Sequence, residues 1–545
     1  RNSFPDLQPM TTDQITDALS LSAKLMELHG ENPFKVKALS NAAYRLDKSG
    51  IELEGKSKEE IEKIEGIGKG IAAKIEELQQ TGSTKELVSL LDKTPVGVVE
   101  MLGIKGIGPK KVAQLWKELE VESPGELLYA CKENRLVELK GFGEKTQNAV
   151  MKAIEFSMAN KGKFHYATAE PWAQSLVEFV KKQTGTELVS LTGKIRRQEL
   201  IIDVIELLVA HEHISLEEFE NPLNIPVEVT VCRPVEFYSA LFRSTATEMH
   251  LKQLESVAFQ INSEAKSEEE IYSAGKLPYI LPELREGRGE ILLAQHNKLP
   301  KLIEVTDLKG ILHCHSTYSD GMNSLEEMAI ACRDLGYQYF GICDHSKSAF
   351  YADGLSEEKV LQQHQEIEKL NAKLGPFKIL KGIESDILYD GSLDYDESIL
   401  QTFDFIVASV HSTLKMDKDK ATQRLLTAIE NPYTSILGHP TGRLLLSREG
   451  YPLDHKKIID ACGANEVAIE LNAHPYRLDI DWTWIPYCME KNVMISINPD
   501  SHEKGSLTDV KWGTIAARKG MLTKEFCLNT KSLTQFESWL SGRWR

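Results

Sequence analysis

The chain has 545 residues, of which 41% are hydrophobic and 27% charged, and its formal net charge is −17 at pH 7. This length exceeds what one hydrophobic core serves, and the composition excludes a disordered or collagen-like chain. No apolar run is long enough to span a membrane, and so acidic a chain cannot hold nucleic acid by its overall charge. The eight cysteines include no Cys-x-x-Cys pair, which predicts reduced thiols in the cytoplasm.

A Gly-x-Gly tripeptide recurs three times in the first 155 residues, which otherwise read as short helices. Each copy follows an apolar residue two positions earlier and precedes a helical run. Two glycines allow a tight turn, and the amides that begin the next helix offer an anion site. We therefore expect helix-hairpin-helix motifs that hold DNA phosphates without reading bases, with plain structural turns as the alternative. The expected DNA-binding residues are Gly66, Gly68, Lys69, Lys74, Gly106, Gly108, Lys110, Gly141, Gly143 and Lys145.

Residues 166 to about 265 alternate apolar strands with helical stretches, which predicts an α+β domain. The Gly-x-Gly repeats followed by Gly193-Lys194-Ile195-Arg196-Arg197 resemble the DNA polymerase X family. The resemblance implies a nucleotidyltransferase palm, in which Gly-Ser-x-Arg-Arg precedes an Asp-x-Asp pair and a third Asp that hold two metal ions. It also matches Lys74 to the lysine with which some members remove deoxyribose phosphate through a Schiff base; a simple phosphate contact is the alternative.

The chain departs from the palm pattern at its acids. Read without gaps, the Asp-x-Asp positions fall on Val204 and Glu206, and the third acid falls on Glu228. A one-residue gap would place Asp203 and Ile205 there instead, so either alignment loses a carboxylate. Because Glu also displaces the oxygens that align the attack, we expect a degenerate palm that no longer polymerises, with a misalignment as the alternative. Its site residues are Arg196, Arg197, Glu206 and Glu228.

From about residue 306 the chain repeats an apolar strand, a polar loop and a helix, and seven strands each end in a potential metal ligand. This order predicts a parallel (β/α) barrel, in which functional groups collect at the carboxyl ends of the strands. Imidazoles mixed with carboxylates favour Zn²⁺, Mn²⁺ or Fe²⁺. His474 remains unassigned, and His364 and His455 are expected on the surface. The expected ligands are His313, His315, Asp320, His345, Glu384, His411, His439, Asp500 and His502.

The segments LHCHSTYSDG, CDHS, GIESD, SVHS, GHPTGR, ELNAHP and NPDSH resemble the polymerase and histidinol phosphatase (PHP) family. Their place behind a polymerase X region is similar to the bacterial branch of DNA polymerase X. The resemblance implies a distorted (β/α)7 barrel with three divalent ions. The implied ligands are, for one ion, His313, His315, Glu384 and Asp500; for a second, Glu384, His411 and His439; and for a third, Asp320, His345 and His502.

Two or three divalent ions would activate water and hydrolyse a phosphodiester bond. We expect a monomeric 3′→5′ exonuclease that acts in DNA repair on DNA ends, gaps or single strands, with no membrane partner and with protein partners left open. The alternatives are an active gap-filling polymerase with a proofreading PHP domain, and a small-molecule phosphatase of the histidinol-phosphatase type. The expected catalytic residues are Glu384, His411, Asp500 and Arg443.

The fold class that we expect is therefore a multidomain chain with an all-α beginning, an α+β centre and an α/β end. A run with Pro278 and Pro282 ends the middle domain, from about residue 306 the pattern changes to strand, loop and helix, and the earlier boundaries follow the family resemblance. The expected segments are a polymerase-β-like helical domain with the first hairpin (1–85), a second helix-hairpin-helix domain (86–160), a palm-like domain (161–275), a linker (276–305) and a PHP domain (306–545).

Overall fold

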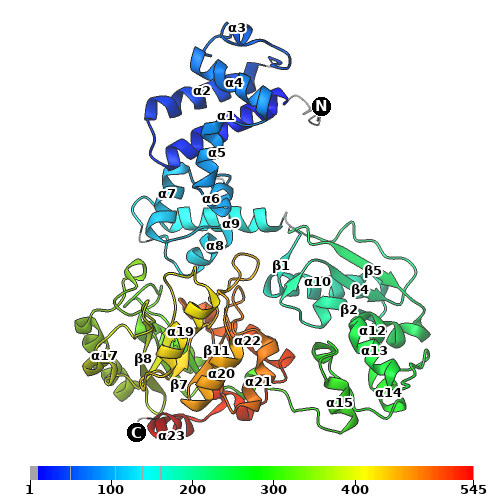
Figure 1. Ribbon diagram of the computed structural model, residues 1–545. Helices are drawn as coiled ribbons and strands as arrows, with labels where there is room; N and C mark the ends of the chain where they lie inside the picture. The colour runs from blue at the N-terminus through cyan, green and yellow to red at the C-terminus, as the bar shows by residue number, and fades with distance from the viewer. Residues whose placement is uncertain are drawn as a thin grey trace. The chain divides into compact units, whose positions relative to one another are not determined.

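The computed structural model describes residues 10–49, 51–104, 106–137, 139–159, 162–221 and 223–543 (Figure 1). The chain divides into two compact units. The first comprises Arg1–Cys131 and Lys140–Ile154, and the second comprises Lys132–Leu139 and Glu155–Arg545. Among the described residues, no helix has the length and apolar character that a membrane crossing requires.

The first unit is built from helices (Figure 1). Its first helix begins after Thr11, whose side chain accepts a hydrogen bond from the Gln14 amide while the Gln14 side chain accepts one from the Thr11 amide. This capping box satisfies two of the amides that a helix start leaves open. The first helix packs against the second, fifth and seventh. The helices are α1 (Thr12–Leu28), α2 (Pro33–Ser49), α3 (Lys58–Ile61), α4 (Lys69–Thr81), α5 (Lys85–Asp92), α6 (Val96–Met101), α7 (Pro109–Glu118), α8 (Pro124–Lys132) and α9 (Glu144–Ala159).

The second unit contains a small α+β region ahead of its barrel. Its three-stranded sheet has the order β2-β4-β5, with β2 antiparallel to β4 and β4 parallel to β5, and β1 pairs with β3. The helix α10 packs on this sheet through an apolar face that includes Ala173, Leu176 and Val180. The elements are β1 (Phe164–His165), α10 (Tyr166–Thr184), β2 (Val189–Thr192), α11 (Gly193–Arg196), β3 (Ile201–Ile202), β4 (Ile205–Val209), β5 (Val227–Val231), α12 (Phe237–Thr245), α13 (Glu248–Ser256), α14 (Glu268–Ala274) and α15 (Glu290–Gln295).

Seven parallel strands form the largest sheet of this unit, in the order β12-β11-β10-β9-β8-β7-β6. A parallel bridge between Cys314 and Ser501 joins the two ends of that order, so the barrel is nearly closed. The strands are buried along almost their whole length, as parallel strands covered on both faces require. The predicted parallel barrel is confirmed. Its strands are β6 (Gly310–Cys314), β7 (Tyr339–Ile342), β8 (Lys378–Asp386), β9 (Phe405–Ser409), β10 (Ile436–Leu437), β11 (Ala468–Asn472) and β12 (Ile495–Asn498).

Helices alternate with these strands along the chain (Figure 1). One prediction about them was wrong: His364 on α17 is only 6% exposed, and its ring lies edge-on to Phe403 at 5.1 Å. His455, also expected on the surface, is half-buried and stacks on Trp484 at 4.7 Å. The helices are α16 (Leu325–Asp334), α17 (Glu357–Leu374), α18 (Glu397–Leu400), α19 (Lys418–Ile429), α20 (His455–Ala464), α21 (Ile485–Glu490), α22 (Val510–Lys519) and α23 (Leu533–Arg543).

Candidate metal centre

The nine side chains expected as ligands all lie at the carboxyl ends of the barrel strands. His313 and Glu384 stand within β6 and β8, and the others follow β6, β7, β9, β10 and β12 in loops. Because parallel strands end at one edge of a barrel, residues as far apart in sequence as 313 and 502 meet there. Eight of the nine residues are buried as a whole. His411 is buried at its side chain, which is only 5% exposed.

The Glu384 carboxylate lies at the middle of this group. Its Oε1 atom is 2.9 Å from Nε2 of His439, 3.0 Å from Nε2 of His411 and 3.2 Å from Nε2 of His313. Its Oε2 atom is 3.1 Å from Nδ1 of His345. Four imidazoles from four different strand ends therefore face one carboxylate, an arrangement in which a single acid can bridge neighbouring cations.

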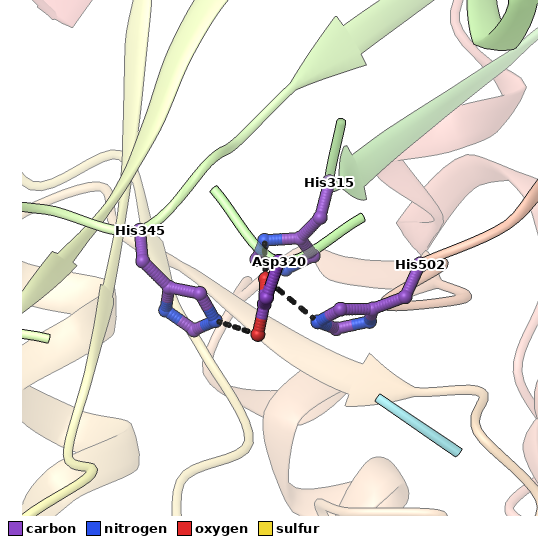
Figure 2. Close-up of side chains that lie close together, drawn as sticks. All are labelled: His315, Asp320, His345 and His502. Carbon is purple, nitrogen blue, oxygen red and sulfur yellow. Dashed lines mark ion pairs between the residues drawn. The ribbon is translucent and has the colours of Figure 1, made fainter. Parts of the chain in front are cut away.

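A second carboxylate, Asp320, lies among three imidazoles in Figure 2. Its Oδ1 atom is 3.3 Å from Nε2 of His502 and 3.8 Å from Nδ1 of His315, and its Oδ2 atom is 3.5 Å from Nε2 of His345. Ligand atoms from these four residues lie within 4.8 Å of one another. They form one group that could hold a metal ion.

A third group includes His313, whose backbone differs from the expected one. In a regular strand, residues two apart such as His313 and His315 would share one face, but the β6–β7 register shifts between Ile311 and Cys314, and His313 adopts a φ of 55°. Asp500 also adopts a positive φ, 51°. Such backbone is costly for residues other than glycine and persists where the surrounding fold enforces it, often at functional sites. The group is His313, His315, Glu384 and Asp500.

Several polar atoms at this centre are buried and make no hydrogen bond within the described part of the chain. A buried polar atom without a partner costs about 1–3 kcal/mol, so a cluster of them calls for a ligand. Mixed imidazole nitrogens and carboxylate oxygens are donors that divalent transition metals prefer. The residues therefore fit metal ions. The atoms are Nε2 of His313, Nδ1 of His315, Oδ2 of Asp320, both ring nitrogens of His345, Oε2 of Glu384, Nδ1 of His439 and Nε2 of His502.

The electrostatics of the protein itself favour ionised acids here. Burial would raise the pKa of Glu384, but the facing imidazoles outweigh burial and hold that pKa well below its ordinary value. Burial would lower the pKa of His411, but Glu384 and Asp386 raise this pKa to about 10. For His315, burial and two neighbouring imidazoles lower the pKa to about 3. The carboxylates are thus ready to bind cations.

Glu470 orients two of the ligands and was not singled out from the sequence. This fully buried carboxylate on β11 accepts from Nδ1 of His313 at 2.6 Å and from the backbone amide of His439 at 2.6 Å. Asn498 donates to it as well, at 2.8 Å. A carboxylate behind an imidazole fixes which ring nitrogen carries the proton and leaves the other nitrogen for the metal. Glu470 therefore directs Nε2 of His313 toward Glu384.

Asp386 supports His411 in the same way, with its Oδ1 atom 2.6 Å from Nδ1 of that ring. Asp344 has a different task, because it accepts from the Ser316 amide at 2.7 Å and from the Ser319 and Gln363 side chains at 2.6 Å each. These bonds hold the loop that carries Asp320. Asp344 lies in CDHS and Asp386 in GIESD, two of the segments that resemble the PHP family. The resemblance could therefore have pointed to both acids.

Arg443, expected to clamp phosphate, is engaged by the fold instead. Its guanidinium donates to the Arg477 carbonyl at 3.0 Å, to the Leu478 carbonyl, and to Asp481 at 2.6 Å. We therefore withdraw Arg443 from the catalytic residues. His474 is buried, and its Nδ1 atom accepts from the Tyr476 amide at 3.1 Å.

In the α+β region the predicted acids Glu206 and Glu228 lie side by side, and Glu206 is already engaged. Glu206 on β4 and Glu228 on β5 are partners in the strand register. Glu206 accepts from the Lys194 amide at 3.1 Å, and its carboxylate lies where a Cβ on Gly193 would stand. The Lys194 ammonium binds Asp203 at 2.7 Å. Lys194, which stands where the family has a serine, thus binds two of the candidate acids, Glu206 and Asp203.

The two arginines of this region are engaged as well. Arg196 donates to Thr245 at 2.6 Å and to the buried Glu268 at 2.5 Å. Arg197 donates to the Thr245 carbonyl at 2.7 Å and to Glu286 at 3.3 Å. Both guanidinium groups therefore connect helices of the region to one another.

The three Gly-x-Gly turns share one backbone conformation at their first glycine. Gly66, Gly106 and Gly141 have φ values of 85°, 99° and 88°, which favour glycine. The second glycines of the first two turns, Gly68 and Gly108, are the N-caps of α4 and α7. The third turn differs, because residues 133–140 ahead of it are not helical in the described positions. Lys69, Lys110 and Lys145 are exposed at the helix starts, whereas Lys74 forms an ion pair with Glu86.

Comparison with known families assigns three parts of the chain. Residues 10–84 match a helix-hairpin-helix domain, residues 98–155 match a SAM-like helix-hairpin-helix tandem, and residues 312–474 match the PHP domain. The PHP domain is a metal-dependent domain, in keeping with the ligand groups at the barrel mouth.

Whole-chain similarity extends this assignment. The chain is 34% identical to the DNA polymerase/3′-5′ exonuclease PolX of Bacillus subtilis, over 97% of this chain and 99% of that protein. A probable phosphatase of Caldicellulosiruptor bescii is 26% identical over 36% of this chain and 80% of its own length. A probable phosphatase of Thermoanaerobacter sp. is also 26% identical, over 30% of this chain and 69% of its own. The chain belongs to the bacterial DNA polymerase X family, with helix-hairpin-helix motifs ahead of a metal-dependent PHP domain.

Proposed function

We propose that the PHP barrel hydrolyses DNA phosphodiester bonds from the 3′ end, in DNA repair in the cytoplasm, and that the palm no longer polymerises. The observation that carries the nuclease proposal is the convergence of buried imidazoles on Glu384, with several ring nitrogens left without hydrogen bonds. The name of the Bacillus subtilis relative includes a 3′-5′ exonuclease. The protein would act as a monomer on DNA ends, gaps or single strands.

In this proposal the nine ligands hold three Mn²⁺, Zn²⁺ or Fe²⁺ ions, in the three sets that the family resemblance implies. Such ions supply an activated water at neutral pH and neutralise charge on the phosphoryl oxygens. The chain's own part is to keep Glu384 ionised between its imidazoles and to keep Nε2 of His313 directed inward through Glu470. Burial excludes bulk water from the acids, which strengthens every charge interaction among them.

The first test replaces the central carboxylate. Glu384→Gln removes the charge that faces four imidazoles while keeping the shape of the side chain. We expect degradation of a 5′-labelled oligonucleotide to fall at least about 100-fold, because a site without its bridging charge no longer aligns water and phosphate. The matched control is Glu358→Gln on the exposed face of α17, which should degrade DNA as the wild type does.

Product patterns separate the competing activities in the same experiment. A ladder that shortens from the 3′ end supports the exonuclease, whereas internal cuts would replace it with an endonuclease. The probable phosphatases among the relatives favour a second candidate, hydrolysis of a phosphomonoester. Faster hydrolysis of histidinol phosphate or p-nitrophenyl phosphate than of DNA by the wild type would establish that candidate in place of the nuclease.

A second test concerns the support of the ligands. Glu470→Gln retains the hydrogen-bonding shape of the side chain but weakens its hold on the proton at Nδ1 of His313. Carboxylates in this position typically contribute 10–100-fold to metal affinity. We expect a loss of that size in Mn²⁺ affinity, measured by calorimetry, while the exposed Glu466→Gln keeps the wild-type affinity. Equal affinities for all three proteins would contradict the supporting role.

The proposal that the palm is degenerate is supported by Lys194, which binds Asp203 through its ammonium and Glu206 through its amide. A carboxylate held in this way is a poor ligand, and the ungapped alignment leaves Val204 at a ligand position. The remaining acid, Glu228, is exposed on β5. The relative named as a polymerase keeps the active gap-filling enzyme as a second candidate.

Primer extension decides between these candidates. In the Glu384→Gln background, which protects the primer from degradation, we expect no templated incorporation with Mg²⁺ or Mn²⁺. The Bacillus subtilis relative serves as the positive control. Robust incorporation that is lost in a further Glu206→Gln, Glu228→Gln variant would prove the palm active and our proposal wrong.

We further propose that the Gly-x-Gly turns hold DNA through phosphates alone. The exposed positions of Lys69, Lys110 and Lys145 beside the helix starts support this role. Replacing all three by Ala should weaken binding of different sequences equally and lower the slope of log affinity against log salt by about 1 per lysine, measured by fluorescence anisotropy. The charge-matched variant with Lys63, Lys93 and Lys117 replaced by Ala should keep the wild-type slope, and equal slopes in both variants would reject these turns as the binding site.

A further inference from the structure

The segment Lys132–Leu139 joins α8 to the third Gly-x-Gly turn, yet its contacts assign it to the same unit as the barrel. Its Glu133 is 2% exposed, and a carboxylate oxygen of Glu133 lies within 4.8 Å of ligand atoms from Asp500 and His502. Nothing in the sequence patterns marks Glu133, because it lies 177 residues ahead of Gly310, where the first barrel strand begins. A tenth potential ligand therefore reaches the centre from outside the PHP domain.

Arg135 holds Glu133 at this position. The two side chains form an ion pair, and the Arg135 guanidinium lies over the Tyr351 ring at 4.4 Å and 3.9 Å from Oδ2 of Asp320. The Tyr351 ring in turn lies 6.0 Å from His345. Between the two charged residues, Asn134 has a φ of 58° and turns the chain tightly. The segment thus contacts the barrel mouth through the charge of Arg135 near Asp320 and through the cation–π contact between Arg135 and Tyr351.

The position of Glu133 is costly for an unliganded acid. It is buried beside Asp500, and like charges in a buried site repel each other strongly. Apart from its ion pair with Arg135, the Oε2 atom of Glu133 is buried and makes no hydrogen bond among the described residues. Both features fit a cation held by Glu133, Asp500 and His502.

We propose that Glu133, which lies in the part of the chain that matches the helix-hairpin-helix tandem, is a metal ligand and forms with Asp500 and His502 a fourth ligand group beside the three sets of the proposed centre. The inference rests on the proposed metal centre and is independent of DNA as its substrate. Arg135 acts as a positioning residue, because it touches Glu133 and Asp320 rather than the ion.

The test measures metal content and affinity in the full chain, with Mn²⁺ as the probe. Glu133→Gln should lose about one ion per chain after desalting, measured by elemental analysis, or should bind that ion 10–100-fold more weakly by calorimetry. Glu133→Asp keeps a carboxylate and should retain part of the affinity. Since Glu133→Gln leaves Arg135 without its ion pair, the double variant Glu133→Gln, Arg135→Gln should show the same loss. The control is Glu155→Gln, whose side chain is 40% exposed and pairs with Lys132.

Two outcomes would overturn the inference, and they differ from failure of the metal centre itself. Wild-type metal content and affinity in Glu133→Gln would remove Glu133 from the ligands. The same metal content together with faster DNA hydrolysis would instead identify Glu133 as an anion that blocks the place of the substrate phosphate. A wild-type protein that retains no Mn²⁺, Zn²⁺ or Fe²⁺ would refute the proposed centre, whatever the variants do.

Discussion

The buried Glu384 carboxylate is the constraint on which the barrel mouth depends. An ionised acid in a protein interior is costly unless opposite charge or hydrogen bonds surround it. Here four imidazoles from β6, β7, β9 and β10 or the loops behind them face it at 2.9–3.2 Å. The parallel barrel brings these residues, distant in sequence, to one acid, so the chemistry of this site depends on the fold.

The two acidic regions of the second unit differ in how their polar atoms are satisfied. In the α+β region, Lys194 binds Glu206, and Glu268 and Glu286 bind Arg196 and Arg197. At the barrel mouth, ring nitrogens and carboxylate oxygens stay buried without hydrogen bonds. Buried polar atoms without partners are rare in native proteins, so those at the barrel mouth call for a ligand.

Much of the barrel could be predicted, because each strand is a short apolar run that ends in His, Asp or Glu, and this pattern is local in sequence. Support for the ligands could not be predicted to the same extent. Glu470 acts across the barrel on His313, and nothing in its own segment says which ring it will meet. The bend at His313 was also missed, since the alternation rule assumes a regular strand, and here a shift in register moves the ring.

Basic residues were the least predictable part of the site. Arg443 follows a ligand strand closely enough to suggest a phosphate clamp, yet the nearby carbonyls and Asp481 take its guanidinium. Arg135, which does lie at the barrel mouth, belongs to a segment that sequence patterns place with the helices. Proximity in the chain is a weak guide for long cationic side chains, because their reach allows many partners.

The segment Lys132–Leu139 has a consequence for how this protein is divided. A PHP fragment that begins near residue 306 would leave Glu133 and Arg135 behind and would expose the face of Tyr351 that the Arg135 guanidinium now covers. Such a fragment would have a different set of side chains at its barrel mouth, even with every strand intact. The chain is therefore less modular than its succession of domain families suggests, and its parts have to be studied together.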